Sequence, residues 1–255
     1  LADTKVWLDA SAQFGPLVKP IITPRFVPSC TSELMTGLAK LAKEYDVPVQ
    51  SHLSENHGEI DWVASLHPES SNYTDVYYEH HLMGTVPTVM AHCIHLSDVE
   101  MDRMADTQTM VSHCPYSNVN LSSGIAPIRK LIERNIPIGL GSDISGGHIV
   151  SMAKVLTEAI GLSKMKWAEV DPNYAPLTLS EAFYMATKGG GQFFGHVGSF
   201  EKGYELDALI IDDTSLFDPN ERSLEERLER WLYVGDDRHI IERYVAGRVV
   251  PSPKG

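Results

Sequence analysis

Cysteine is scarce in this sequence. Three cysteines occur among 255 residues, Cys30, Cys93 and Cys114, and none belongs to a Cys-x-x-Cys pair. Three are too few for a disulfide scaffold and fit a reducing, cytoplasmic compartment. The missing pair also excludes a zinc site of the cytidine-deaminase type, which needs His-x-Glu together with Pro-Cys-x-x-Cys.

Basic residues and long apolar runs are also limited. Lys and Arg number 21 against 34 acidic residues, which gives a formal net charge of -13. Without a basic patch to offset phosphate repulsion, nucleic acid is disfavoured as a partner. No apolar run is long enough to span a bilayer, so no membrane association is expected.

Two further signals are missing at and near the start. The chain opens Leu1-Ala2-Asp3-Thr4, with no Met, no basic segment and no apolar leader. It is expected to be the interior of a longer protein, although a processed or trimmed terminus would look the same. No glycine-rich phosphate fingerprint follows the first predicted strand, which argues against a doubly wound nucleotide-binding sheet.

Strands and helices alternate through the first two-thirds of the chain. Short apolar runs predict strands at 20–23, 47–53, 88–92, 109–113 and 136–143. Helical spacing predicts helices at 34–45, 57–66, 73–82, 125–132 and 150–163, and capping boxes predict helices after Ser97 and Thr178. Apolar strands followed by helices indicate a parallel sheet covered by helices.

Reactive side chains recur where these strands end, at Arg25, His52, His92, His113 and Asp143. In a (β/α)8 barrel, residues at the carboxyl ends of strands meet at one face. Five strand–helix units are fewer than eight, so we predict an incomplete (β/α)8 TIM barrel over residues 1–197. Residues 198–255, with predicted strands at 207–211 and 244–250 and a charged helix at 224–231, are expected to contribute to a small β-rich domain.

His52 is the strongest single candidate for chemistry. A lone His is usually satisfied by a hydrogen bond, but here Glu55 follows three residues later at a strand–helix junction. Glu55 alone could be a first-turn residue that complements the helix dipole. Together, a metal ligand and a carboxylate are what metal-assisted hydrolysis requires.

Asp143, His92 and His113 are further candidates. Asp143 ends a strand before Gly146-Gly147 and could instead cap the next segment. His113 could be structural, because Pro115 indicates a shaped loop after it. Zinc takes three or four protein ligands, and the sequence contains no His-x-His pair on a strand, so the metal site is expected to be half present.

These residues resemble the guanine deaminase family of the metal-dependent amidohydrolase superfamily, over about residues 17–250. The resemblance is carried by Thr23-Pro24-Arg25-Phe26, Gln50-Ser51-His52-Leu53-Ser54-Glu55-Asn56, His113-Cys114-Pro115 with Ser117-Asn118, Gly139 to Gly147, and Leu232-Tyr233-Val234-Gly235-Asp236-Asp237-Arg238. It implies an amidohydrolase barrel with a small β domain, and hydrolysis of guanine to xanthine and ammonia in purine catabolism.

The resemblance also implies roles for individual residues. One zinc ion would be held by His52 and Asp143 here, while the family's His-x-His pair is absent from this chain. Glu55 would protonate the purine ring, Asp143 would accept a proton from water, and His92 would stabilise the developing tetrahedral centre.

Arg25 and Phe26 would hold the purine, so the substrate-binding set is Arg25, Phe26, His52, Glu55 and Asp143. A surface ion pair and a core aromatic are the ordinary alternatives for Arg25 and Phe26. The family commonly forms homodimers.

Two other functions compete with this one. The chain could be another ring-directed amidohydrolase, of the cytosine or triazine type, although a purine-sized Arg-Phe clamp argues against it. It could also be a catalytically incomplete fragment or a scaffold, which the missing His-x-His pair favours.

Overall fold

The computed structural model describes residues 1–251, which divide into two compact units. The first comprises Leu1–His113 with Ala126–Pro137, and the second comprises Cys114–Ile125 with the chain from Ile138 onward. Each unit is described by itself. The predicted division into a partial barrel, residues 1–197, and residues 198–255 of a small β domain stays a prediction.

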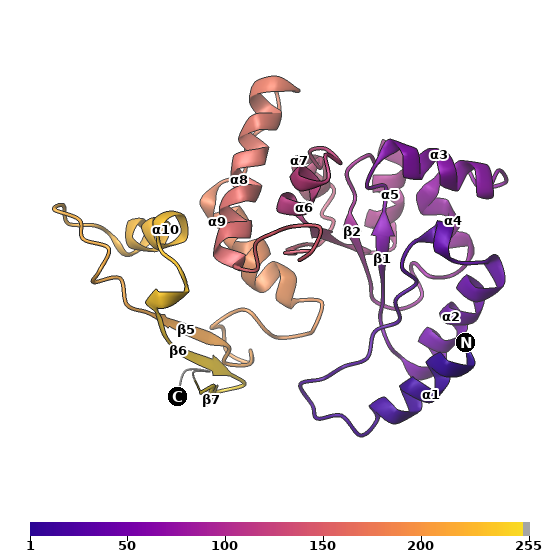
Figure 1. The fold of residues 1–255 in the computed structure, drawn as a ribbon, viewed down its shortest axis with the longest axis horizontal. Helices are drawn as coiled ribbons and strands as arrows, with labels where there is room; N and C mark the ends of the chain where they lie inside the picture. The colour runs from indigo at the N-terminus through magenta and orange to yellow at the C-terminus, as the bar shows by residue number, and fades with distance from the viewer. Residues whose placement is uncertain (252–255) are drawn as a thin grey trace. The chain divides into compact units, whose positions relative to one another are not determined.

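The first unit alternates helices with three strands (Figure 1). Its strands are β1 (Val49–Leu53), β2 (Thr88–His92) and β3 (Met110–His113). Its helices are α1 (Ala2–Ser11), α2 (Ser32–Tyr45), α3 (His57–Leu66), α4 (Tyr73–Glu79), α5 (Asp98–Asp106) and α7 (Ile128–Glu133), with a 3-10 turn at Val27–Ser29.

The three strands are parallel, in the order β1-β2-β3, as the sequence predicts. In the β1–β2 register His52 lies opposite Ala91, and Leu53 lies opposite His92. The carboxyl ends of the two strands therefore meet at one edge. Burial alternates along β1, where Val49, Ser51 and Leu53 are buried while His52 lies on the other face.

Local capping explains where several helices begin. Thr31 accepts a hydrogen bond from the Leu34 amide at the start of α2, as predicted. The predicted capping boxes at Ser97 and Thr178 are confirmed, and each has its reciprocal Glu three residues later. Helix α4 lies against both α3 and α5 (Figure 1).

The second unit contains α6 (Pro115–Asn120), β4 (Ile138–Leu140), α8 (Met152–Glu169) and α9 (Leu179–Tyr184), which runs into a π-turn at Met185–Gly189. A three-stranded antiparallel sheet follows, in the order β5 (Ala208–Ile211), β6 (Ile240–Val245), β7 (Arg248–Val249). Helix α10 (Leu224–Val234) and a 3-10 turn at Asp237–His239 lie between β5 and β6 in sequence.

Several predicted elements differ from the observed ones. The strand expected at 20–23 is only an isolated bridge between Ile22 and Val49, since prolines at 20 and 24 remove ladder donors. The loop expected after His113 is helix α6, because Pro115 starts a helix as well as it shapes a loop. The strand expected at 244–250 is interrupted by a turn at Ala246 and Gly247, whose φ angles are 48° and 73°.

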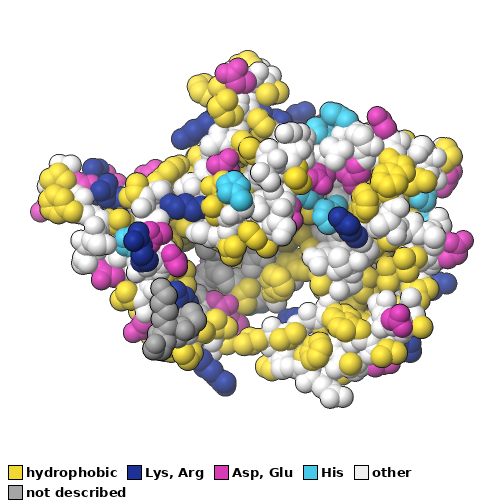
Figure 2. All heavy atoms as spheres, in the orientation of Figure 1, with side chains coloured by type: hydrophobic (Ala, Val, Ile, Leu, Met, Phe, Trp, Pro, Cys, Tyr) yellow, Lys and Arg dark blue, Asp and Glu magenta, His cyan; other side chains and the backbone are white. Residues whose placement is uncertain are grey.

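Apolar side chains remain visible on the surface (Figure 2). In the first unit, exposed apolar residues cluster in sequence near the start, at Val6, Trp7, Phe14, Leu17 and Val18. Within residues 1–251, no helix has the length and apolar character needed to cross a membrane.

Candidate active site

His52 is fixed by the backbone of Arg25. Its ring atom Nδ1 lies 2.6 Å from the Arg25 carbonyl oxygen, and its amide donates to the same oxygen at 3.2 Å. A carbonyl can only accept, so Nδ1 carries the proton and Nε2 keeps its lone pair. This tautomer makes Nε2 available as a metal ligand, with a carbonyl in the orienting role typical of metal-binding histidines.

His92 and Glu55 join His52 at the carboxyl ends of β1 and β2. The rings of His52 and His92 are stacked, with centroids 5.3 Å apart and planes inclined by 25°. Nε2 of His92 lies 3.8 Å from Oε2 of Glu55. The His92 side chain is 1% exposed and that of Glu55 is 17% exposed. Three predicted site residues are thus brought together in the first unit.

Left-handed backbone conformations occur at several of these positions. His92 and Cys93 have φ angles of 71° and 52°, and Ser54, between His52 and Glu55, has φ 49°. Asp143, in the second unit, has φ 43°. Non-glycine residues in this region are uncommon, cost of order 1–3 kcal/mol each and cluster at functional sites. His92 and Asp143, two residues that the sequence predicts, are thus among the eleven non-glycine residues of 1–251 with a positive φ angle.

His113 ends β3 and is buried, with 2% of its surface exposed. Among the described residues, its Nδ1 atom has no hydrogen-bond partner. Burial, with a smaller contribution from the charge of His92, lowers the pKa of His113 to about 3. His113 is therefore neutral at pH 7 and supplies a ring nitrogen rather than a charge.

Arg25 and Phe26 lie directly before a 3-10 turn. The Arg25 guanidinium carbon is 5.7 Å from the centre of the Phe26 ring, which meets Trp62 edge-on at 6.0 Å. The Arg25 carbonyl accepts the hydrogen bond from His52, whereas the Arg25 side chain lies beside the Phe26 ring. This combination agrees with, but does not test, the predicted purine clamp.

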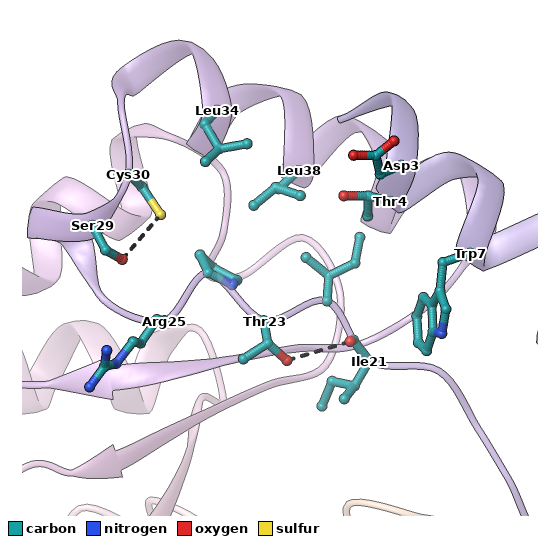
Figure 3. A pocket seen from close by; sticks show the side chains of 12 residues that line it. Asp3, Thr4, Trp7, Ile21, Thr23, Arg25, Ser29, Cys30, Leu34 and Leu38 are labelled. Atoms are coloured by element: carbon teal, nitrogen blue, oxygen red, sulfur yellow. Dashed lines mark hydrogen bonds between the residues drawn. The ribbon is translucent and has the colours of Figure 1, made fainter.

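A cavity of about 550 Å³ lies between α1, α2 and the segment that carries Arg25 (Figure 3). Trp7, Leu34 and Leu38 form apolar walls, while Ser29 and Cys30 make a polar contact of 3.7 Å across one side. Neither His52 nor Glu55 lines it. The cavity therefore shares Arg25 with the candidate site but is not the place where His52, Glu55 and His92 meet.

Asp143 belongs to the second unit, where it follows β4 in a tight loop. Its carbonyl accepts a hydrogen bond from the Gly147 amide at 2.6 Å, and Asn120 Nδ2 donates to the Gly146 carbonyl at 2.7 Å. In residues 1–251 no group of three or more His, Cys, Asp and Glu side chains could hold a metal ion. Zinc takes three or four protein ligands, so the described residues do not by themselves show a complete zinc site.

Two polar residues beside the predicted ones were missed. Ser51 contacts the carbonyls of Pro24 and Arg25, and Glu59 accepts a hydrogen bond from the amide of Glu55. The spacing of Asn56 and Glu59 could have indicated the second, because an N-cap Asn with Glu three residues on is close to a capping box. Nothing in the sequence marked Ser51.

A family model for the amidohydrolase family matches residues 8–250. This chain belongs to the amidohydrolase family. It has the family's α/β fold, with four short strands, β1 to β4, alternating with helices. The chain is also similar to guanine deaminase from Dictyostelium discoideum, with 44% identity over 98% of this chain and 57% of that protein.

The chain is also similar to solved structures of deaminases. The structure of guanine deaminase from C. acetobutylicum with guanine bound in its active site is 52% identical, with a TM-score of 0.94, over 98% of this chain and 59% of that one. An adenosine deaminase from Xanthomonas campestris with bound zinc has a TM-score of 0.84 at 21% identity, over 97% of this chain and 55% of that one, which shows a shared fold. This amidohydrolase spans between half and three-fifths of the length of these relatives.

Proposed function

We propose that this amidohydrolase chain contributes most of the active site of a guanine deaminase, which hydrolyses guanine to xanthine and ammonia. The observation that carries the proposal is the 52% identity to a guanine deaminase whose structure holds guanine in the active site. The site of the first unit supports it, because His92 stacks on the His52 ring and lies 3.8 Å from the Glu55 carboxylate.

Each residue of the site has a chemical task in this proposal. Glu55, partly buried beside His92, donates a proton to the ring nitrogen next to the attacked carbon and then helps ammonia leave. His92 donates a hydrogen bond to the oxygen on which charge develops. Asp143 accepts a proton from the attacking water. A reaction on a small neutral base is compatible with an acidic protein.

The substrate is held by Arg25 and Phe26. The guanidinium fork of Arg25 matches the O6 and N7 acceptors of guanine, and Phe26 covers one face of the ring. Trp62, which meets Phe26 edge-on, limits how far that ring can turn. We propose that His52, Glu55 and Asp143 complete the substrate pocket, as the resemblance to guanine deaminases implies.

Zinc is the cofactor that we propose, one ion per site. When bound, zinc lowers the pKa of water to about 7 and so supplies hydroxide at neutral pH. The Nε2 atom of His52 and the carboxylate of Asp143 are two ligands, and their number falls short of the three or four that zinc takes. We therefore propose that the remaining ligands come from outside these 255 residues, as a His-x-His pair.

The same reasoning extends to architecture and surroundings. We propose a closed (β/α)8 barrel in the complete assembly, with residues 198–255 in a small β domain, in the cytoplasm. Exposed apolar residues in the first segment, such as Leu17 and Val18, favour a further chain segment or a second copy in a homodimer. Light scattering of the purified chain tests this, and a monodisperse monomer would count against it.

The activity is tested by fusing this chain behind the amino-terminal part of the Dictyostelium discoideum relative and measuring ammonia release. We expect turnover of guanine and not of cytosine, adenine or chlorotriazines, and loss of turnover in the Glu55→Gln chimera. Turnover of another ring without guanine would overturn the substrate, and a folded, zinc-loaded chimera without any turnover would overturn the proposal.

A second function is favoured by one observation, the missing His-x-His pair. An amidohydrolase chain without a complete metal site could act as a binding or scaffold protein. Metal analysis of the purified chimera decides between them. Stoichiometric zinc with ammonia release favours the enzyme, whereas zinc-free protein without ammonia release favours the scaffold.

A further inference from the structure

Two buried tyrosines stand one helical turn apart on α4. Tyr73 is 3% exposed and Tyr77 is fully buried, and their rings are stacked with centroids 5.6 Å apart. Residues four apart on a helix share one face, so both hydroxyls point the same way. Both reach backbone segments that carry candidate site residues.

The Tyr77 hydroxyl contacts the end of β1. It lies 2.8 Å from the carbonyl oxygen of His52 and 2.6 Å from Oγ of Ser51. Ser51 donates to the Pro24 carbonyl at 2.7 Å, and its Oγ lies 3.2 Å from the Arg25 carbonyl. Tyr77 therefore donates to the His52 carbonyl, and Ser51, which contacts the Tyr77 hydroxyl, connects it to the carbonyls of Pro24 and Arg25.

The contacts of Tyr77 and Ser51 form a first branch, which ends at the His52 ring. The Arg25 carbonyl that Ser51 approaches is the one that accepts the Nδ1 proton of His52. The position of that carbonyl decides which ring nitrogen carries the proton. Tyr77 and Ser51 thus act on His52 from its backbone side.

The contacts of Tyr73 and Glu59 form a second branch, which reaches the turn after β1 through the Glu59 carboxylate. The Tyr73 hydroxyl donates to Oε1 of Glu59 at 2.7 Å, and the other oxygen, Oε2, accepts the amide proton of Glu55 at 3.0 Å. Glu59 is 8% exposed, and its own amide donates to Asn56 at 2.9 Å. The turn that carries the Glu55 side chain is held by a buried carboxylate.

Core packing alone does not explain these hydroxyls. Phenylalanine would fill the same space without the cost of burying a hydroxyl and a carboxylate, a cost that is largest when a partner is lost. The Tyr77 hydroxyl is directed at the end of β1, and the Tyr73 hydroxyl is directed at Glu59, which accepts from the Glu55 amide.

We propose that Tyr77 and Glu59 are positioning residues of the deaminase site. Tyr77, with Ser51, sets the strand end and the Arg25 carbonyl that hold the His52 ring, and Glu59, with Tyr73, fixes the turn that presents Glu55. The proposal rests on the proposed function, but its first test uses the chain alone.

The first branch is tested by the tautomer of His52 in chain labelled with ¹⁵N-histidine, with His52→Asn identifying the signal. In the parent chain we expect the Nδ1–H form. Tyr77→Phe and Ser51→Ala should each give a mixture of tautomers, while Tyr78→Phe, on the exposed side of the same helix, should not. An unchanged tautomer in both folded variants would overturn this branch.

The second branch is tested by hydrogen exchange of the Glu55 amide. Glu59→Ala should speed this exchange by about tenfold or more, because one hydrogen bond of the amide is lost. Tyr73→Phe should have a smaller effect in the same direction. Asp61→Asn is the matched control, because Asp61 is an exposed residue of α3, the helix that carries Glu59. Equal exchange in Glu59→Ala and Asp61→Asn would overturn this branch.

Turnover in the chimera separates positioning from packing. Glu59→Gln should lower kcat by about tenfold to a hundredfold with KM for guanine changed less than about threefold, since small misplacement of a catalytic group affects the reacting state most. A rise in KM of about tenfold to a hundredfold with unchanged kcat would contradict the proposal. Absence of turnover in the parent chimera would contradict the proposed function instead, and the tautomer and exchange results would still decide the positioning role.

Discussion

Oε2 of Glu55 lies 3.8 Å from Nε2 of His92, although the two side chains come from different strand ends and 37 residues separate them. The parallel register brings them together by placing Leu53 opposite His92. A partly exposed carboxylate beside a buried imidazole is an arrangement suited to moving a proton between substrate and protein.

Replacing Glu55 with Gln should therefore abolish proton transfer while leaving the shape of the pocket unchanged. In the chimera we expect kcat for guanine to fall by about 10²- to 10⁴-fold, with guanine still bound. Steady-state kinetics and guanine titration measure the two effects. Glu44→Gln, whose side chain is 62% exposed, is the control and should behave as the parent. Comparable kcat values for Glu55→Gln and Glu44→Gln would contradict the role of Glu55.

A substitution at Arg25 can test the role of its side chain without removing the backbone carbonyl that contacts His52. Arg25→Gln keeps the carbonyl that holds His52 but removes the guanidinium from the purine. Loss of a charge-assisted hydrogen bond of about 1.5–3 kcal/mol should raise KM for guanine about tenfold to a hundredfold, with a smaller change in kcat. The penalty should shrink for 2-aminopurine, which lacks O6. Equal penalties for both purines would argue against recognition of O6 by Arg25.

Gly146 packs against the Asp143 carboxylate. A Cβ at Gly146 would lie 2.6 Å from Oδ2 of Asp143 and 2.6 Å from Oγ of Ser117. Gly146→Ala should therefore lower the free energy of unfolding by about 1–3 kcal/mol and displace the Asp143 side chain. Urea denaturation measures the change.

Gly161, inside α8, is the matched control for that substitution. A Cβ there would meet nothing within 4 Å, and alanine is favoured over glycine in a helix interior. Gly161→Ala should raise the free energy of unfolding by about 0.5–1 kcal/mol. If Gly146→Ala is as stable as Gly161→Ala, the close packing around Asp143 is not as described.

His113 should make stability depend on pH. Its folded pKa of about 3 lies below the unfolded value of 6.5, so only the unfolded chain binds this proton between pH 6.5 and pH 3. Its contribution to stability is full above pH 6.5 and is lost as the pH falls, by about 2 kcal/mol between pH 7 and pH 5.

A His113→Asn variant removes that proton from the unfolded state. The parent should lose about 2 kcal/mol more than this variant between pH 7 and pH 5, as measured by urea denaturation at both values. Exposed His81 gives the control, because His81→Asn should retain the parental slope. Parallel pH profiles for the parent and His113→Asn would show that the pKa of His113 is not lowered in the folded chain.

Zinc affinity reports on the incomplete ligand set. We expect the 255-residue chain alone to bind zinc only at about micromolar concentrations or more weakly, since His52 and Asp143 are two of the three or four ligands required. The chimera should bind one equivalent more tightly, and His52→Asn should weaken it. Competition with a chromogenic chelator measures both. A tight one-to-one complex of the chain alone would contradict the missing ligand pair.

The sequence by itself predicted the elements and features that depend on near neighbours. The caps at Thr31, Ser97 and Thr178 join residues three apart, so their side chains and amides meet wherever the helix forms. The resemblance to guanine deaminases likewise pointed to His52, Glu55 and Asp143 through short motifs. The roles of these residues stay predictions.

Only the tertiary structure decided which distant residues meet. The parallel register places β1 beside β2, and helix α4 brings Tyr73 to the Glu59 carboxylate and Tyr77 to the Ser51 hydroxyl, 14 and 26 residues away. No local pattern specifies such contacts, because they depend on how several buried faces pack at once. For that reason the sequence showed His52 followed by Glu55, and the fold added the buried hydroxyls and carboxylate that hold both in place.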